Sequence, residues 1–153
     1  MSFADAIRTC FSKYATFSGR ARRSEFWYFV LLTFIVGVVL GIVAAVLMAG
    51  SIASDSEALA SGMTSLPAGV MVVYGIAAVF NLAVLLPFLA VSVRRLHDTD
   101  RSGGFWFLNL IPFVGGIIVL VFYCLAGTVG PNRFGADPKG SPVGAAAPAR
   151  VNA

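Results

Sequence analysis

The segment that decides the fold is Arg94-Arg95-Leu96-His97-Asp98-Thr99-Asp100-Arg101-Ser102, a charged joint between two long apolar runs. It contains the single His of the chain, two of its seven acids and three of its eleven Lys and Arg residues. Charged side chains need water, phosphate or one another, because a hydrocarbon interior solvates none of them. The joint therefore indicates where the chain leaves a membrane, with membrane segments on either side.

The composition is also that of a membrane protein. Of the 153 residues, 58% are hydrophobic and only 12% are charged, which is too apolar for an ordinary soluble domain. The net charge of +4 is compatible with nucleic acid or with an anionic membrane surface. The basic residues lie beside apolar runs, which favours membrane lipids as partners. We predict no nucleic-acid partner. Cys10 lies in the basic leader, whereas Cys124 lies far away in the sequence, deep in an apolar run. This placement does not suggest a disulfide framework.

Two charge-free runs precede the joint, over residues 26–49 and 69–93. At about 1.5 Å per residue, each is long enough to cross a hydrocarbon core of roughly 30 Å as a helix. We predict both as transmembrane helices, joined by a loop over residues 50–68. A cleaved signal peptide is the competing interpretation, but the first run is much longer than the ~7 to 15 residues of a signal core.

A third apolar run, over residues 105–126, follows the joint and is interrupted by Pro112 and by Gly115-Gly116. It can form a single kinked span or a hairpin that enters the membrane and returns. Backbone that re-enters must be sheltered by protein or by a wet cavity, and a three-span molecule offers little shelter. We therefore predict a third full span.

Three residues within the first two spans are candidates for helix packing. Gly37 and Gly41 begin a stripe of small residues that permits close approach of another helix, either of this chain, which is the default, or of a second copy. Asn81 lies near the middle of the second run, where its amide needs a partner. We predict that Asn81 bonds between helices rather than serving transport. Pro87 predicts a kink in the same helix.

The leader before the first span predicts a short helix over residues 3–14. Its apolar residues recur at helical spacing and form one face, with the basic residues on the opposite face. Ser2 and Asp5 are spaced as a capping box. Such a helix lies flat at the headgroup level or packs on the rest of the protein, and both interpretations stay open. Three arginines then precede the span. We interpret them mainly as a topological anchor, with lipid phosphate as a second possible contact.

Helical spacing within the joint predicts an ion-pair cluster, since Arg94, Arg95 and Arg101 lie three or four residues from Asp98. Glu25 and lipid phosphate are further candidate contacts. His97 and Asp98 are adjacent and point in different directions on a helix, so no metal, cofactor or catalytic site is predicted. The candidate cluster for headgroup or partner binding comprises Arg20, Arg22, Arg23, Glu25, Arg94, Arg95, His97, Asp98 and Arg101.

The distribution of charge predicts the orientation of the three spans. The leader and the joint carry most of the Lys and Arg residues and would share one side, so both are predicted to be cytoplasmic. A third span then makes the C-terminus periplasmic. Residues 1–138 are predicted to form one membrane domain. Residues 139–153, which are rich in Gly, Ala and Pro, are predicted to form a disordered tail.

Three motifs carry a resemblance to a known family, in order along residues 11–138. They are Phe17-x-Gly19-Arg20-x-Arg22-Arg23-x-Glu25-x-Trp27, Arg94-Arg95-Leu96-His97-Asp98-x-x-Arg101-Ser102 and Gly130-x-Asn132-Arg133-Phe134-Gly135-x-Asp137-Pro138. They resemble domain-of-unknown-function family number 805, the small bacterial inner-membrane proteins of the YhaH type. The resemblance implies an inner-membrane location and assigns no biochemical activity.

Three classes of function are compatible with these features. The favoured one is a membrane scaffold or adaptor that presents a basic cytoplasmic face to lipids or to a membrane protein partner, including a second copy. A transporter or channel component is the alternative, because Asn81 and the prolines lie within apolar runs. A membrane-embedded enzyme is the least favoured, since the joint is better explained by ion pairs than by catalysis.

Overall fold

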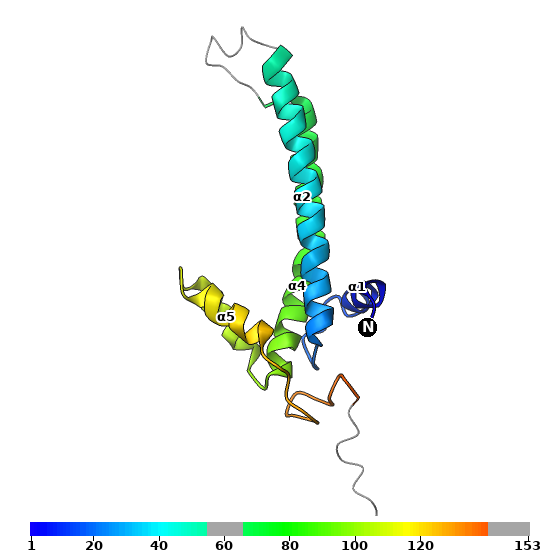
Figure 1. The fold of residues 1–153 in the computed structure, drawn as a ribbon, viewed down its shortest axis with the longest axis vertical. Coiled ribbons are helices and arrows are strands. Elements are labelled where there is room, and N and C mark those ends of the chain that lie inside the picture. Colours follow the sequence, from blue (N-terminus) through cyan, green and yellow to red (C-terminus); the bar gives the residue numbers. More distant parts are fainter. Residues whose placement is uncertain (55–65, 141–153) are drawn as a thin grey trace, which may run out of the picture. The chain divides into compact units, whose positions relative to one another are not determined.

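The computed structural model describes residues 1–54 and 66–140. These residues form an all-α fold, shown in Figure 1, and their one β-bridge joins Asn132 and Gly135. The centre of the predicted loop, residues 55–65, and most of the predicted tail, residues 141–153, lie outside the described residues. The elements in chain order are α1 (Phe3–Ser12), α2 (Arg23–Ser54), α4 (Ala68–Asp98), the 3₁₀ helix η1 (Gly103–Leu110) and α5 (Gly115–Cys124).

Helices α2 and α4 contain the first two predicted spans, 26–49 and 69–93. Among the described residues, these two helices are long and apolar enough to cross a membrane. Most of their large apolar side chains point outward; Val79 and Leu82 of α4, for example, are each 69% exposed. Exposed apolar side chains along a whole helix are costly in water and are what a hydrocarbon solvent requires.

The third apolar run does not form the single span that we predicted for residues 105–126. It folds into η1 and α5, which pack on one another as a short helical hairpin. The ring of Phe105, near the start of the run, lies edge-on to the ring of Phe122 near its end, with centroids 5.8 Å apart. Two residues that a continuous helix would separate by many turns are therefore neighbours.

The reversal of the hairpin depends on backbone features between the two helices. Pro112 has no N–H to continue η1, and Phe113 adopts the left-handed region with φ 65°. Gly115 then begins α5 so close to η1 that an added Cβ would lie 1.7 Å from the carbonyl oxygen of Leu108. Only glycine permits this approach. The chain therefore turns back within the run that we predicted to form one continuous span.

The leader forms α1, which begins with the predicted capping box. The Ser2 hydroxyl accepts from the backbone N–H of Asp5, and the Asp5 carboxylate accepts from the backbone N–H of Ser2. The Ser2 hydroxyl also donates to the Asp5 carboxylate, and this bond, together with the one from the Ser2 backbone N–H, lowers the pKa of Asp5. Ala6 and Cys10 on one face of the helix are buried against the protein, whereas Phe3 is exposed. Its position at a membrane interface stays a prediction.

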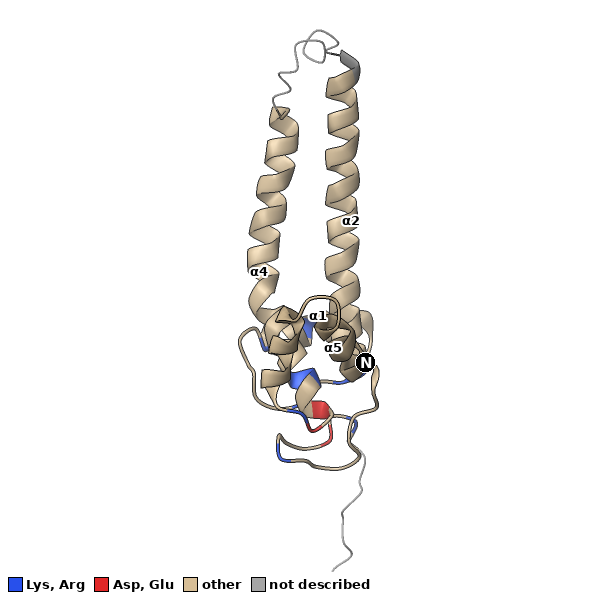
Figure 2. Cartoon of the chain, turned by 90° about the vertical axis from the view of Figure 1, so that its left-hand side faces the viewer, with Lys and Arg blue, Asp and Glu red and all other residues tan. Residues whose placement is uncertain are grey.

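The chain divides into two compact units. The apolar unit comprises the described residues of 29–86, which form most of α2 and α4 and include no charged side chain. The polar unit comprises residues 1–28 and 87–140, with α1, the first turns of α2, the end of α4, the hairpin and the C-terminal segment. Figure 2 shows the Lys, Arg, Asp and Glu residues on the elements of the polar unit and none on the helices of the apolar unit.

Candidate functional site

The centre of the polar unit is an ion-pair cluster made by two carboxylates and three arginines. Arg95 pairs with Asp98 one turn along α4, and Arg20 of the leader reaches the same carboxylate, with 2.9 Å between its Nη2 and Oδ1 of Asp98. Arg94 pairs with Glu25 at the start of α2, at 2.7 Å between Nη1 and Oε1. None of the five residues is more than 7% exposed. The charges are therefore satisfied by one another rather than by solvent.

The same arginines also hold the chain that follows the hairpin. Arg20 donates to the carbonyl oxygens of Thr128 and Gly130, both at 2.6 Å. Arg95 donates from Nε to the carbonyl of Tyr123 at 3.2 Å and from Nη2 to that of Leu125. The last carbonyls of a helix have no partner within the helix, so these guanidinium groups replace the missing backbone donors at the end of α5.

His97 lies between the leader and the C-terminal segment. Its Nδ1 atom is 3.2 Å from the carbonyl oxygen of Gly19, and its ring stacks on Phe134 with centroids 4.0 Å apart and an interplanar angle of 2°. The side-chain amide of Asn132 donates to the backbone carbonyl of His97 at 2.9 Å. The single histidine thus joins two segments that are distant in sequence, and its ring is occupied by structural contacts.

The remaining predicted residues, Arg22, Arg23 and Arg101, lie around this cluster. Arg22 donates from Nε to the carbonyl of Pro138, and Arg23 is exposed and approaches the carbonyl of Cys124 at 3.4 Å. The guanidinium of Arg101 lies over the ring of Phe122, 4.1 Å from its centroid. These three arginines make carbonyl and ring contacts within the polar unit, without a carboxylate partner among the described residues.

Residues 130–138 form a turn whose contacts with the ion-pair cluster were not predicted. Asp137 organises this turn by accepting from the backbone N–H groups of Gly130 at 3.1 Å and Lys139 at 2.8 Å, and these bonds lower its pKa. Gly130 has φ +79° and Gly135 has φ +138°, conformations that glycine adopts without strain. The turn thereby presents the carbonyl of Gly130 to Arg20. The signal in the sequence was the pattern of Asn, Gly, Asp and Pro.

These contacts correct the predicted relation between the two ends of the chain. We predicted the leader on one side of the membrane and everything after the third run on the other. Arg20 and Arg22 instead touch the carbonyls of Thr128, Gly130 and Pro138. Residues 128–138 therefore lie beside the leader in the structure, because the third run turns back as a hairpin.

Comparison with known proteins agrees with this arrangement of motifs. The family model described as protein of unknown function (DUF805) matches residues 14–136, which include every residue of the ion-pair cluster. The chain belongs to the DUF805 family. The resemblance predicted from the three motifs is thus confirmed, and no solved structure matches the chain.

Two relatives of this DUF805 chain are inner membrane proteins of Escherichia coli (strain K12). Inner membrane protein YhaI is 40% identical over 126 residues, which cover 82% of this chain and 88% of the relative. Inner membrane protein YhaH is 42% identical over 129 residues, which cover 84% of this chain and 92% of the relative. Together with the apolar helices α2 and α4, they support the predicted inner-membrane location.

The groups available for chemistry in this DUF805 chain are few. The described residues include no group of three or more His, Cys, Asp or Glu side chains that could hold a metal ion. Glu25 and Asp98 are each paired with arginine in the ion-pair cluster. Burial, reinforced by the nearby charge of Glu25, raises the pKa of the Cys10 thiol to about 12. This thiol is therefore a poor nucleophile at neutral pH.

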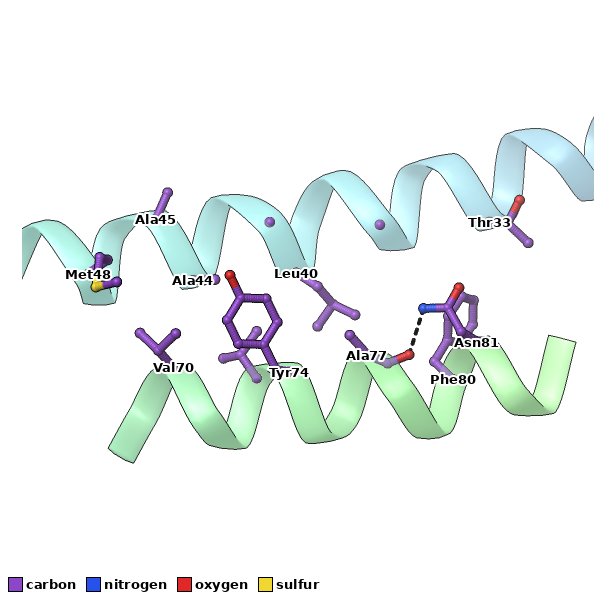
Figure 3. A pocket seen from close by; sticks show the side chains of 13 residues that line it. Thr33, Leu40, Ala44, Ala45, Met48, Val70, Tyr74, Ala77, Phe80 and Asn81 are labelled. Atoms are coloured by element: carbon purple, nitrogen blue, oxygen red, sulfur yellow. Dashed lines mark hydrogen bonds between the residues drawn. The ribbon is translucent and has the colours of Figure 1, made fainter. Parts of the chain in front are cut away.

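The apolar unit contains a cavity of about 420 Å³ between α2 and α4. The residues that line it include Gly37, Gly41 and Asn81. Figure 3 shows the cavity from close by, with Asn81 on α4. The Asn81 amide donates to the carbonyl of Ala77 at 2.7 Å, one turn back on its own helix, and not to the other helix as we predicted. An added Cβ at Gly37 or Gly41 would meet nothing within 4 Å. The predicted packing of this stripe within the chain is therefore not found among the described residues.

Proposed function

We propose that this chain is a small inner-membrane scaffold or adaptor whose polar unit forms a rigid head at the cytoplasmic boundary. The observation that carries the proposal is the complete internal pairing of Arg20, Glu25, Arg95 and Asp98. An active site keeps acids and bases available to substrate, whereas this cluster uses them to fix the positions of the leader, α4 and the C-terminal segment. The arrangement supports a structural role for the motifs that carry the family resemblance.

The exposed cations of the leader supply the contact surface of the proposed scaffold. Arg8, Lys13 and Arg23 are exposed, in contrast to the three buried arginines of the cluster. Each Lys or Arg near an anionic membrane surface contributes about 1 kcal/mol of attraction. A head that buries part of its charge and exposes the rest is suited to rest on lipid headgroups or on an acidic partner.

The cytoplasmic orientation follows from the same charges. Ten of the eleven Lys and Arg residues belong to residues 1–28 and 87–140, whereas the segment between α2 and α4 has two acids and neither Lys nor Arg. Short loops rich in Lys and Arg stay in the cytoplasm. Both the N-terminus and residues 128–138 are therefore proposed to be cytoplasmic, and the chain to cross the membrane twice.

A reporter fused after the last residue should detect this orientation. We expect green fluorescent protein at the C-terminus to be fluorescent and alkaline phosphatase at the same position to be inactive, because the phosphatase requires the periplasm. Fusions to a chain truncated after residue 60 should show the reverse pattern. An active phosphatase at the C-terminus would contradict the two-span topology and restore a third crossing.

The glycine face of α2 is the proposed contact for a second helix, either of another copy or of a membrane partner. Substituting Gly37→Leu together with Gly41→Leu should abolish the complex recovered by crosslinking in native membranes. The thermal stability of the monomer should change little, because an added Cβ at either position meets open space. Gly75→Leu is the matched control, since Gly75 of α4 is equally open but does not line the cavity. A complex that survives the double substitution would exclude this face.

A further inference from the structure

The polar unit contains a second hollow, a cleft of about 410 Å³ beside α1. It is bordered by α1, the arginines of the leader, the first turn of α2 and the end of the C-terminal segment. The residues that line it are Met1, Asp5, Thr9, Lys13, Arg20, Arg22, Glu25 and Pro138. None of the contacts described for the ion-pair cluster requires this space. The residues that line the cleft are mainly polar or charged.

Both carboxylates of the cleft are already neutralised or hydrogen-bonded by the protein. Asp5 accepts from the Ser2 hydroxyl at 2.6 Å and from the Ser2 backbone N–H at 3.1 Å. Glu25 accepts from Arg94 at 2.7 Å. These acids therefore have little remaining demand for a cationic ligand, and a metal ion would have to displace an internal partner.

Two cations of the cleft, in contrast, have donors to spare. The ammonium of Lys13 makes no hydrogen bond or ion pair with any described residue. Among the described residues Arg22 uses only Nε, in its bond to the carbonyl of Pro138, so both terminal nitrogens of its guanidinium have donors for a ligand. Arg20 adds positive charge to the wall, although its own donors are already engaged.

A third arginine lies behind this wall. Arg94 is 1% exposed, and its Nε and Nη2 have no hydrogen-bond partner within the part of the chain that the structure describes. Its charge is balanced by Glu25, which its Nη1 contacts, but the buried guanidinium retains unused donors next to a residue that lines the cleft.

We propose that this cleft binds the phosphate group of an anionic ligand, with Lys13 and Arg22 as the direct contacts. A guanidinium edge and an ammonium bind phosphate in complementary ways, the first by a two-point contact and the second as a point charge. The proposal rests on the proposed function and makes it specific, since it replaces a diffuse basic face with one site. The phosphate can come from a lipid headgroup or from a free phosphate, and the experiment separates these sources.

The test uses the full chain in a neutral detergent, titrated by calorimetry with dioctanoyl phosphatidylglycerol and, separately, with inorganic phosphate. Wild type should bind at least one of them saturably. The double variant Lys13→Gln, Arg22→Gln should weaken that binding about tenfold or more, because each cation near an anionic headgroup contributes about a fivefold effect. The double variant Arg133→Gln, Lys139→Gln removes the same charge from two exposed residues that do not line the cleft. It should change the affinity by less than about twofold, because the loss of one direct contact alone is expected to cost about fivefold.

The outcomes distinguish the two sources of the phosphate. They also distinguish failure of the cleft proposal from failure of the proposed scaffold function. Binding of the lipid alone identifies a headgroup site, and equal binding of inorganic phosphate identifies a site for free phosphate. Equal losses in the two double variants would overturn the cleft and leave the basic face of the scaffold in place. Saturable binding that neither double variant weakens, or no binding at all, would overturn both the cleft and the basic face of the scaffold. If Arg22→Gln fails to fold, Lys13→Gln alone must still lose about fivefold, because the Lys13 side chain has no structural contact to lose.

Discussion

Asp98→Asn should destabilise the polar unit by about 3 to 5 kcal/mol, the range observed when one partner is removed from a buried ion pair. Asp98 is 3% exposed and is the common acceptor of Arg20 and Arg95. The amide of Asn has nearly the shape of the carboxylate but no charge, so two guanidinium groups would remain buried together without a counter-ion. The backbone carbonyls that accept from Arg20 and Arg95 would remain, but neither guanidinium would keep a carboxylate partner.

The measurement is thermal unfolding of the detergent-solubilised chain, together with proteolysis of the C-terminal segment. Arg20 also holds the carbonyls of Thr128 and Gly130, so loss of its carboxylate partner should expose residues 128–138 to cleavage. Asp100→Asn is the matched control, because Asp100 is largely exposed and pairs with Arg133 at the surface, where an ion pair contributes about 0 to 1 kcal/mol. Asn also tolerates the positive φ of 56° at this position. Equal stability of the two variants would show that the buried cluster does not hold the polar unit together.

The local part of this cluster was predictable from the sequence, and the distant part was not. The pairing of Arg95 with Asp98 follows from a spacing of three residues on a helix. Spacing also placed Arg94 near Asp98, but Arg94 pairs instead with Glu25, which is 69 residues away in sequence. Helical periodicity describes neighbours on one element only, so contacts between elements depend on how they pack. Glu25 had been considered as a contact, but its specific partner was visible only in the structure.

The two long helices were predictable because an apolar run of sufficient length has few alternatives. The hairpin was not predictable in the same way, since residues 105–126 are apolar whether they cross or turn back. Pro112 and Gly115-Gly116 were recognised as interruptions, yet an interruption is equally compatible with a kink. The decision depends on the positive φ of Phe113 and on the close approach of Gly115 to Leu108, which are three-dimensional facts.

The prediction of a third span also determined the predicted position of the C-terminal segment. A third crossing assigned residues 128–138 to the periplasm and hid their contact with the leader. Once the run turns back, the carbonyls of Thr128 and Gly130 become available to Arg20. Gly127 illustrates how close this contact is, because a Cβ there would lie 2.0 Å from Oδ2 of Asp98. The hairpin and the ion-pair cluster are therefore parts of one structural solution.

Gly115→Ala should break the hairpin, with a loss of stability of at least about 3 kcal/mol, the upper end of the usual range for overpacking. The added methyl would lie 1.7 Å from the carbonyl oxygen of Leu108 and 2.7 Å from its carbonyl carbon. Both atoms belong to the backbone, so no side-chain rotation can relieve the overlap. Helices η1 and α5 must separate, and the contact between Phe105 and Phe122 should be lost.

Gly116→Ala provides the control, one residue further along the same helix. Its added Cβ would meet only Oδ1 of Asn109, at 4.0 Å, and Ala favours a helix by up to about 1 kcal/mol over Gly. Thermal unfolding in detergent should therefore give opposite signs for the two substitutions, a loss at Gly115 and no loss or a gain at Gly116. If residues 105–126 formed one kinked span instead, both glycines would lie on a continuous helix, and Ala would be tolerated at either. Equal behaviour of the two variants would thus contradict the hairpin and favour a third crossing.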